Sequence, residues 1–310
     1  MPIAVIALEF DPFLHVGGWG IRLETLGLAL AIVSAVVVAA LVARLTPADP
    51  GSANGAPGGA TLGPADVLYV VLAAIPGALV GGRLGYGLVH LVYYMAQPAA
   101  LLDPGRGSLE LSLGVVGAAV TGGYAARLLT GSAGPWFHAA AFPTLLLIGA
   151  GKVALALGGA GQGVPSDAAW ATSYIGPGPW GSLAPDVASH PAQLFEAAGT
   201  GLVAIALVRL SIVGWFRVPD GRAWLVAVGG WALVRAISAS TWRDPEVLGP
   251  LRAEQLLAVA LAAGCAAIAI ALDRPSASRG AGAGGVSWPD PDTSSRDATN
   301  RLLHGRQERT

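Results

Sequence analysis

The sequence predicts an all-α polytopic membrane protein with seven transmembrane helices, its N-terminus outside the cell and its C-terminus inside. Hydrophobic residues make up 54% of the chain and charged residues only 12%, with a mean hydropathy of +0.60. A soluble domain carries about 25% charged residues because its surface must be solvated. Apolar windows long enough to cross roughly 30 Å of hydrocarbon recur along the chain, and arginines flank them unevenly.

The apolar windows predict one helix each. In chain order they are 26–43, 67–90, 110–126, 136–157, 192–208, 223–241 and 255–272. The first and the last contain no charged residue, whereas the third and the fifth are short and rich in glycine. Gly77, Gly81 and Gly85 recur every four residues in the second window, a spacing that lets helices pack closely. These windows therefore predict one compact bundle.

Loop charge predicts the orientation and the division of the chain. Residues 153–208 contain no Lys or Arg, so the loop near 158–190 is expected on the outer side of the membrane. Arginines at the span ends are more numerous on the opposite, inner side. We therefore expect a membrane domain over residues 1–274 with an extracytoplasmic loop. The polar, Gly/Ser/Pro-rich residues 275–310 are expected to form a disordered cytoplasmic tail.

Charge and motif spacing exclude several functions. The net charge of −1 argues against a nucleic-acid partner. The histidines and carboxylates show no metal-ligand spacing, and no cofactor is expected. Lys152, the only lysine, lies in "GAGKVALALGGAGQG" (149–163). This segment lacks the first glycine of a phosphate-binding loop, and Val153 replaces the hydroxyl residue that would bind magnesium, so a nucleotide site is excluded.

Four ionisable residues interrupt the apolar windows: Arg83, Lys152, Glu196 and Arg235. A charge near the bilayer centre costs about 2.5–3.5 kcal/mol, so such residues need partners or a polar cavity. Helix rise places all of them in the outer half of the membrane under the predicted orientation. Three cations and one carboxylate predict a net positive pocket for an anionic lipid headgroup, because Arg and Lys bind phosphate well. The alternative is that each side chain extends to the interface or forms a structural ion pair.

The segment "HPAQLFEA" (190–197) follows the uncharged outer loop. Pro191 suits the first turn of a helix, which places Gln193 and Glu196 on one face. His190 would then stand at the opening of the positive pocket. It is a candidate base, phosphate ligand or helix cap.

Four segments together resemble the prolipoprotein diacylglyceryl transferases, seven-span enzymes of the bacterial plasma membrane. They are "GALVGGRLGYGLVH" (77–90), "GKVALALGGAGQGVPSDAAWA" (151–171), "HPAQLFEA" (190–197) and "GRAWLVAVGGWALVRAISASTWRDPE" (221–246). The resemblance implies transfer of the diacylglyceryl group of phosphatidylglycerol, or another anionic lipid, to the lipobox cysteine of a prolipoprotein signal peptide. The product is a thioether, and glycerol phosphate leaves.

The residue patterns and the resemblance together predict roles for the residues named above. Arg235 and His190 are the expected catalytic residues. The expected substrate-binding residues are Lys152, Arg83, Arg235, Gln193 and Glu196. Lys152 stands where the family signature has Arg, so it keeps the charge but loses the bidentate geometry.

The chain departs from the family pattern at polar positions. Ser112 stands where the family has His. Leu155, Gly158 and Ala160 replace two Asn and one acidic residue of the signature, and Trp231 and Ala239 replace Tyr and Glu around Arg235. Two alternatives therefore accompany the transferase. One is a catalytically lapsed member that binds an anionic lipid or a membrane partner, and the other is an unrelated small-solute transporter or channel.

Overall fold

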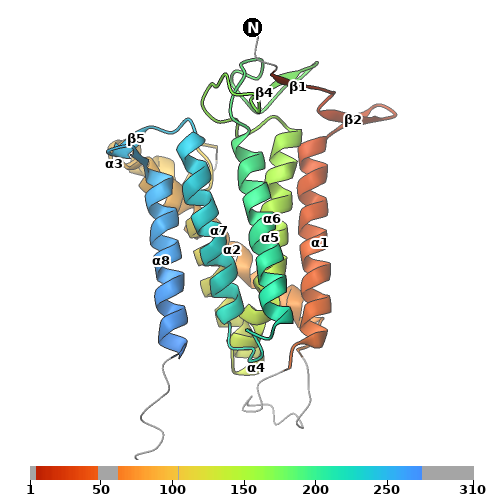
Figure 1. The fold of residues 1–310 in the computed structure, drawn as a ribbon, viewed down its shortest axis with the longest axis vertical. Helices are drawn as coiled ribbons and strands as arrows, with labels where there is room; N and C mark the ends of the chain where they lie inside the picture. Colours follow the sequence, from red (N-terminus) through yellow and green to blue (C-terminus); the bar gives the residue numbers. More distant parts are fainter. Residues whose placement is uncertain (1–4, 48–61, 104, 274–310) are drawn as a thin grey trace, which may run out of the picture. The chain divides into compact units, whose positions relative to one another are not determined.

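Seven helices long and apolar enough to cross a membrane form the body of the protein in a computed structural model that describes residues 5–47, 62–103 and 105–273 (Figure 1). They are α1 (Leu23–Leu45), α2 (Asp66–Val89), α4 (Leu111–Thr130), α5 (Gly134–Leu157), α6 (Ala192–Ile212), α7 (Arg222–Ser238) and α8 (Ala253–Asp273). The seven predicted spans are confirmed. The largest differences are at Thr130 and Ile212, where the helices run about one turn further than predicted. The predicted tail, 275–310, lies outside the described residues.

Short strands and helical turns accompany the long helices. They are β1 (Ile6–Glu9), β2 (Phe13–Val16), β3 (Trp19–Arg22), α3 (Leu91–Ala96), η1 (Pro98–Leu101), β4 (Thr172–Ile175), η2 (Ala239–Thr241), β5 (Glu246–Leu248) and β6 (Leu251–Arg252). β2 pairs with β3 and β5 with β6 as antiparallel hairpins, and Gly17 takes a φ of +60° in the first of these turns. β1 pairs in parallel with β4. The labelled strands and α3 all lie at one end of the long helices (Figure 1).

Glycines allow α2 and α4 to pack closely. A Cβ atom added at Gly77 or Gly117 would collide with the backbone carbonyl of the other glycine, and one at Gly81 would collide with the carbonyl of Leu113. The backbones can approach this closely only because no side chain separates them. The spacing of Gly77 and Gly81 in the sequence therefore marks a true helix interface.

Helix α5 packs against α1, α6 and α7. The largest buried cluster joins α5, α6 and α7 through side chains that include Leu145, Leu207, Val228 and Trp231, with Trp231 fully buried. Cys265 of α8 belongs to the same cluster and is buried there as a small apolar side chain. This packing brings together the ionisable residues carried by α5, α6 and α7.

Candidate functional site

A buried ion-pair cluster occupies the bundle near the end that carries the strands. It contains Lys152 of α5, Glu196 of α6, Arg235 of α7, Glu110 at the start of α4 and Glu254 in the first turn of α8. We call these five residues the ionic cluster. Five helices contribute one residue each, so the cluster exists only when the bundle is assembled.

Glu196 is the centre of the ionic cluster. Lys152 Nζ lies 2.7 Å from Glu196 Oε2, and Arg235 Nη1 donates to Glu196 Oε1 at 3.2 Å. The indole Nε1 of Trp231 donates to the same Oε1 at 3.1 Å. Glu196 is fully buried. A buried carboxylate needs such donors, because desolvation of an unpaired charge costs several kcal/mol.

Glu110 connects α4 to α7 and α2. Its side chain caps α4 by accepting the backbone N–H groups of Ser112 and Leu113, each at 2.8 Å. Glu110 Oε1 also accepts from Arg235 Nη2 at 3.1 Å, and its backbone N–H donates to the Gly82 carbonyl at 2.8 Å. A carboxylate suits this position because the N-terminus of a helix carries partial positive charge.

Two tryptophan rings lie against the cations. The guanidinium carbon of Arg235 lies 4.6 Å from the ring centroid of Trp242 and 5.8 Å from that of Trp231. Lys152 Nζ lies 5.2 Å from the Trp242 ring centroid. These distances suit cation–π attraction, which strengthens when the cation is desolvated. The rings thus hold Lys152 and Arg235 in a largely water-free environment.

Three polar atoms in and beside the ionic cluster are buried without a hydrogen-bond partner in the described part of the chain. They are Arg235 Nε, Glu254 Oε2 and Ser112 Oγ. Arg235 Nη2 lies 3.8 Å from Glu254 Oε1, which is an ion-pair distance but not a hydrogen bond. Native proteins pair nearly all buried polar groups, so atoms left free in one place are candidates for binding substrate.

The prediction of a net positive pocket is wrong in its charge. Two carboxylates that it did not count, Glu110 and Glu254, join the ionic cluster, so two cations face three carboxylates. Glu110 begins one apolar window and Glu254 immediately precedes another, and charges at such positions are expected at the membrane interface. The one sequence feature that could have indicated these two glutamates is that each stands at the start of a helix, at the same membrane end as Arg235.

Arg83 is not held by the ionic cluster. Its guanidinium donates to five backbone carbonyls of the α3–α4 connection, at 2.6–3.3 Å: those of Ala100, Leu101, Asp103, Arg106 and Ser108. Ala100 and Leu101 belong to η1, and the other three residues lie in the irregular segment between η1 and α4. Arg83 therefore does not join Lys152, Glu196 and Arg235, contrary to the prediction. Arg83 instead fixes the loop that precedes Glu110.

His190 and Gln193 are held by neighbours in the segment between α5 and α6. Trp170 Nε1 donates to His190 Nδ1 at 3.2 Å, so a neutral His190 ring carries its proton on Nε2 and presents a donor. Gln193 Nε2 donates to the Tyr174 hydroxyl at 3.0 Å. Burial raises the pKa of Tyr174 and keeps its hydroxyl protonated, although the Gln193 bond opposes this.

Seven apolar helices around a buried ionic cluster define a multi-pass membrane protein with a polar site inside its bundle. Residues 13–271 match the model of the prolipoprotein diacylglyceryl transferase family. The chain belongs to this family.

Several bacterial proteins named phosphatidylglycerol–prolipoprotein diacylglyceryl transferase are similar to the chain. The protein of Geobacter sulfurreducens is 29% identical over 62% of this chain and 72% of its own length. That of Azoarcus sp. is 31% identical over 64% and 70%, and that of Methylocella silvestris is 30% identical over 68% and 74%.

Proposed function

We propose that the protein transfers the diacylglyceryl group of phosphatidylglycerol to the cysteine thiol of a prolipoprotein. The family and the printed names of the relatives support this reaction. We further propose that the acceptor is the signal peptide of the prolipoprotein and that the enzyme resides in the bacterial plasma membrane. The N-terminus would face outward, because the arginine distribution follows the positive-inside rule.

The free N–H donors of Arg235 and Lys152 carry the assignment of the phosphate site. Arg235 Nε is buried and has no acceptor in the described chain. Lys152 has three ammonium donors, of which Glu196 Oε2 receives one, and its side chain is 13% exposed. A phosphate that reaches both residues would gain charge-assisted hydrogen bonds without breaking the pairs with Glu196. Fixed cations of this kind also stabilise the charge that develops on a leaving phosphate.

Three buried acceptors, one of them on Gln193 itself, support a site for the glycerol hydroxyls of the headgroup. Gln193 Oε1, Gln162 Oε1 and Thr172 Oγ1 have no hydrogen-bond partner in the described residues, and all three residues are buried. Gln162 Nε2 donates to the Thr172 carbonyl at 3.3 Å, which places two of the segments side by side. Hydroxyl donors of a polyol would satisfy these oxygens. His190, through Nε2, would offer a further donor to the headgroup.

An apolar groove between α7 and α8 supports binding of the acyl chains. It has a volume of about 460 Å³, and its lining includes Leu225, Gly229, Leu233, Val259, Ala262 and Ala269. All of these side chains are apolar or absent, as acyl chains require. Arg235 follows Leu233 on the same helix, so the groove begins close to the ionic cluster.

Complementation tests the proposed reaction. The chain is expressed in a strain depleted of its own diacylglyceryl transferase, and mass spectrometry measures diacylglyceryl thioether on a reporter lipoprotein. Adduct is expected. If none forms although the protein is folded and inserted, the transferase assignment is rejected.

A binding assay tests the phosphate site separately. Lys152→Ala and Arg235→Ala are expected to weaken binding of phosphatidylglycerol, whereas Arg127→Ala, an exposed arginine in the last turn of α4, should not. Unchanged binding in both site variants would reject the phosphate site. Binding without any adduct in the complementation test would make the protein a lipid-binding member of the family.

A further inference from the structure

The proposed transfer needs a group that removes the proton from the acceptor thiol. The thiolate is the nucleophile, and an ordinary cysteine is mostly protonated at neutral pH. Ser112, which stands where the family resemblance places a His, offers only a hydroxyl, and a hydroxyl does not accept a proton at neutral pH. The base must therefore come from elsewhere. In His190, the candidate base of the sequence, Nδ1 already accepts from Trp170 Nε1, whereas the ionic cluster supplies three carboxylates.

Two of the three carboxylates are already committed. Both oxygens of Glu196 accept from Lys152, Trp231 or Arg235, and the residue is fully buried. Both oxygens of Glu110 accept backbone N–H groups at the start of α4, and Oε1 also accepts from Arg235. Protonation of either group would break these bonds and unpair a buried cation, which is strongly unfavourable.

Glu254 has a carboxylate oxygen free to accept a proton, which the other two carboxylates lack. Its single ion-pair contact in the described chain, 3.8 Å to Arg235, is too long for a hydrogen bond, and its Oε2 has no partner. Its side chain is 15% exposed, whereas those of Glu110 and Glu196 are inaccessible. The unpartnered N–H of Arg235 Nε belongs to the same guanidinium that Glu254 faces. A free acceptor and a free donor thus stand together in the cluster.

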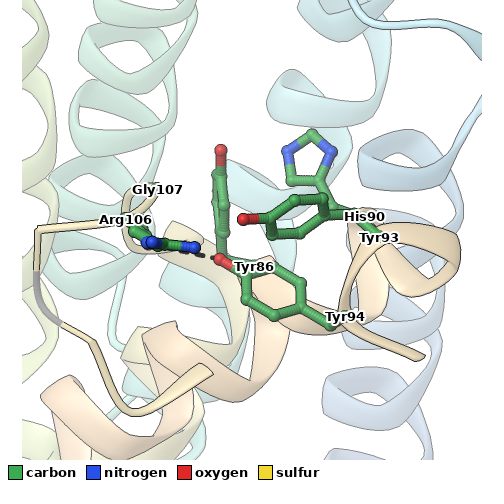
Figure 2. Close-up of a pocket in the computed structure, with 6 residues that line it drawn as sticks. All are labelled: Tyr86, His90, Tyr93, Tyr94, Arg106 and Gly107. Atoms are coloured by element: carbon green, nitrogen blue, oxygen red, sulfur yellow. Dashed lines mark hydrogen bonds between the residues drawn. The ribbon is translucent and has the colours of Figure 1, made fainter. Parts of the chain in front are cut away.

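An open pocket lies on the side of the site where α2 continues into α3. It has a volume of about 610 Å³ and is lined by Tyr86, His90, Tyr93, Tyr94, Arg106 and Gly107. Figure 2 shows the three tyrosine rings and His90 around the space, with Arg106 beside Tyr94. Glu254 does not line this pocket, and its own access from outside the bundle is shown by the 15% exposure of its side chain.

We propose that Glu254 is the catalytic base that accepts the proton of the substrate thiol, an inference that rests on the proposed transferase function. The S–H bond breaks, and the proton moves to Glu254 Oε2. The thiolate then forms the C–S bond to the glyceryl carbon of phosphatidylglycerol, and the C–O bond to the phosphate breaks with its electron pair on oxygen. Glycerol phosphate leaves, and the proton passes from Glu254 to the leaving group or to water.

The charges of the ionic cluster are consistent with this step. With all groups ionised, two cations face three carboxylates, so the cluster carries one excess negative charge. A proton on Glu254 removes that charge as the leaving phosphate gains one. Arg235 and Lys152 are then balanced within the protein by Glu110 and Glu196. The transfer of one proton therefore prepares the cluster for the developing dianion.

The competing explanation is that Glu254 is only a structural counter-ion of Arg235. The test compares Glu254→Gln with the wild type on two acceptor peptides, one with the lipobox cysteine and one with selenocysteine in its place. A selenol ionises at much lower pH than a thiol and needs no base. General-base catalysis contributes about 10²–10⁴-fold, so the variant should lose about that factor with the cysteine peptide and less than about tenfold with the selenocysteine peptide.

Three further measurements keep the test decisive. Glu254→Asp, which retains a carboxylate, should recover part of the rate. Glu246→Gln, at an exposed position of β5, should match the wild type. Glu254→Gln should still bind phosphatidylglycerol, which shows that the bundle is intact.

The outcomes separate the base from the function. An unchanged rate in Glu254→Gln, or an equal loss with both peptides, overturns the assignment of Glu254 while the wild type still makes adduct. A wild type that makes no adduct with either peptide overturns the transferase function, and with it the catalytic base.

Discussion

Replacing Glu196 is expected to destabilise the bundle more than replacing Lys152, its partner in the ion pair. Glu196→Gln removes the one carboxylate shared by Lys152 and Arg235, so two buried cations lose a partner. Lys152→Met leaves Glu196 with its bonds from Arg235 and Trp231. The first substitution should therefore destabilise the protein more than the second.

The distances in the ionic cluster set the size of the expected loss in the free energy of unfolding. At an effective dielectric constant of about 20, opposite charges 2.7 Å apart attract by about 332/(20 × 2.7), or roughly 6 kcal/mol, before the cost of desolvation. Removal of one partner of a buried pair costs about 3–5 kcal/mol in measured systems. We expect about that loss for Glu196→Gln, and about 1–3 kcal/mol for Lys152→Met, which leaves hydrogen-bonding capacity unused.

The assay is the free energy of unfolding in bicelles, measured for both single variants and for the double variant. The double variant should lose less than the sum of the singles, with a coupling of about 0.5–3 kcal/mol, because it leaves no unpaired Lys152 ammonium. Glu246→Gln should stay within about 0.5 kcal/mol of the wild type. Equal losses in the two single variants, or strict additivity in the double variant, would refute this reasoning.

Three further predictions concern the packing around the site. Gly117→Ala should lower the free energy of unfolding by roughly 1–3 kcal/mol, because its Cβ meets the Gly77 backbone. Gly264→Ala, whose Cβ would have nothing within 4 Å, should be neutral or slightly stabilising. Equal effects of the two substitutions would contradict the close contact of α2 and α4. Arg83→Met should raise the rate of amide hydrogen exchange in the α3–α4 connection, because charged hydrogen bonds of about 1.5–3 kcal/mol each are lost. An unchanged exchange rate would show that Arg83 does not hold the loop. Ala262→Trp should fill the groove between α7 and α8 and weaken binding of long-chain phosphatidylglycerol about tenfold, roughly 1.4 kcal/mol. Ala267→Trp lies outside that groove and should leave the affinity unchanged. Similar affinities in both variants would exclude the groove as an acyl-chain site.

Hydropathy alone predicted the seven helices because of a physical constraint. A segment in hydrocarbon must satisfy its own backbone N–H and C=O groups, so an apolar window of sufficient length becomes a helix whatever its tertiary neighbours. The glycine spacing at Gly77 and Gly81 likewise indicated close packing before any partner helix was known. The pairing of Lys152, Glu196 and Arg235 was also predictable in outline, because isolated charges in apolar helices need partners.

The composition of the site could be decided only by the tertiary structure. Arg235 meets Glu110 across 125 positions of the sequence, and no local pattern encodes such a contact. Arg83, by residue type a phosphate ligand, is committed to backbone carbonyls because the α3–α4 loop folds over it. Sequence determined which segments enter the membrane, since that depends on each segment's own transfer free energy. Packing decided which charges meet inside it, since that depends on how five helix ends converge around Glu196 and Arg235.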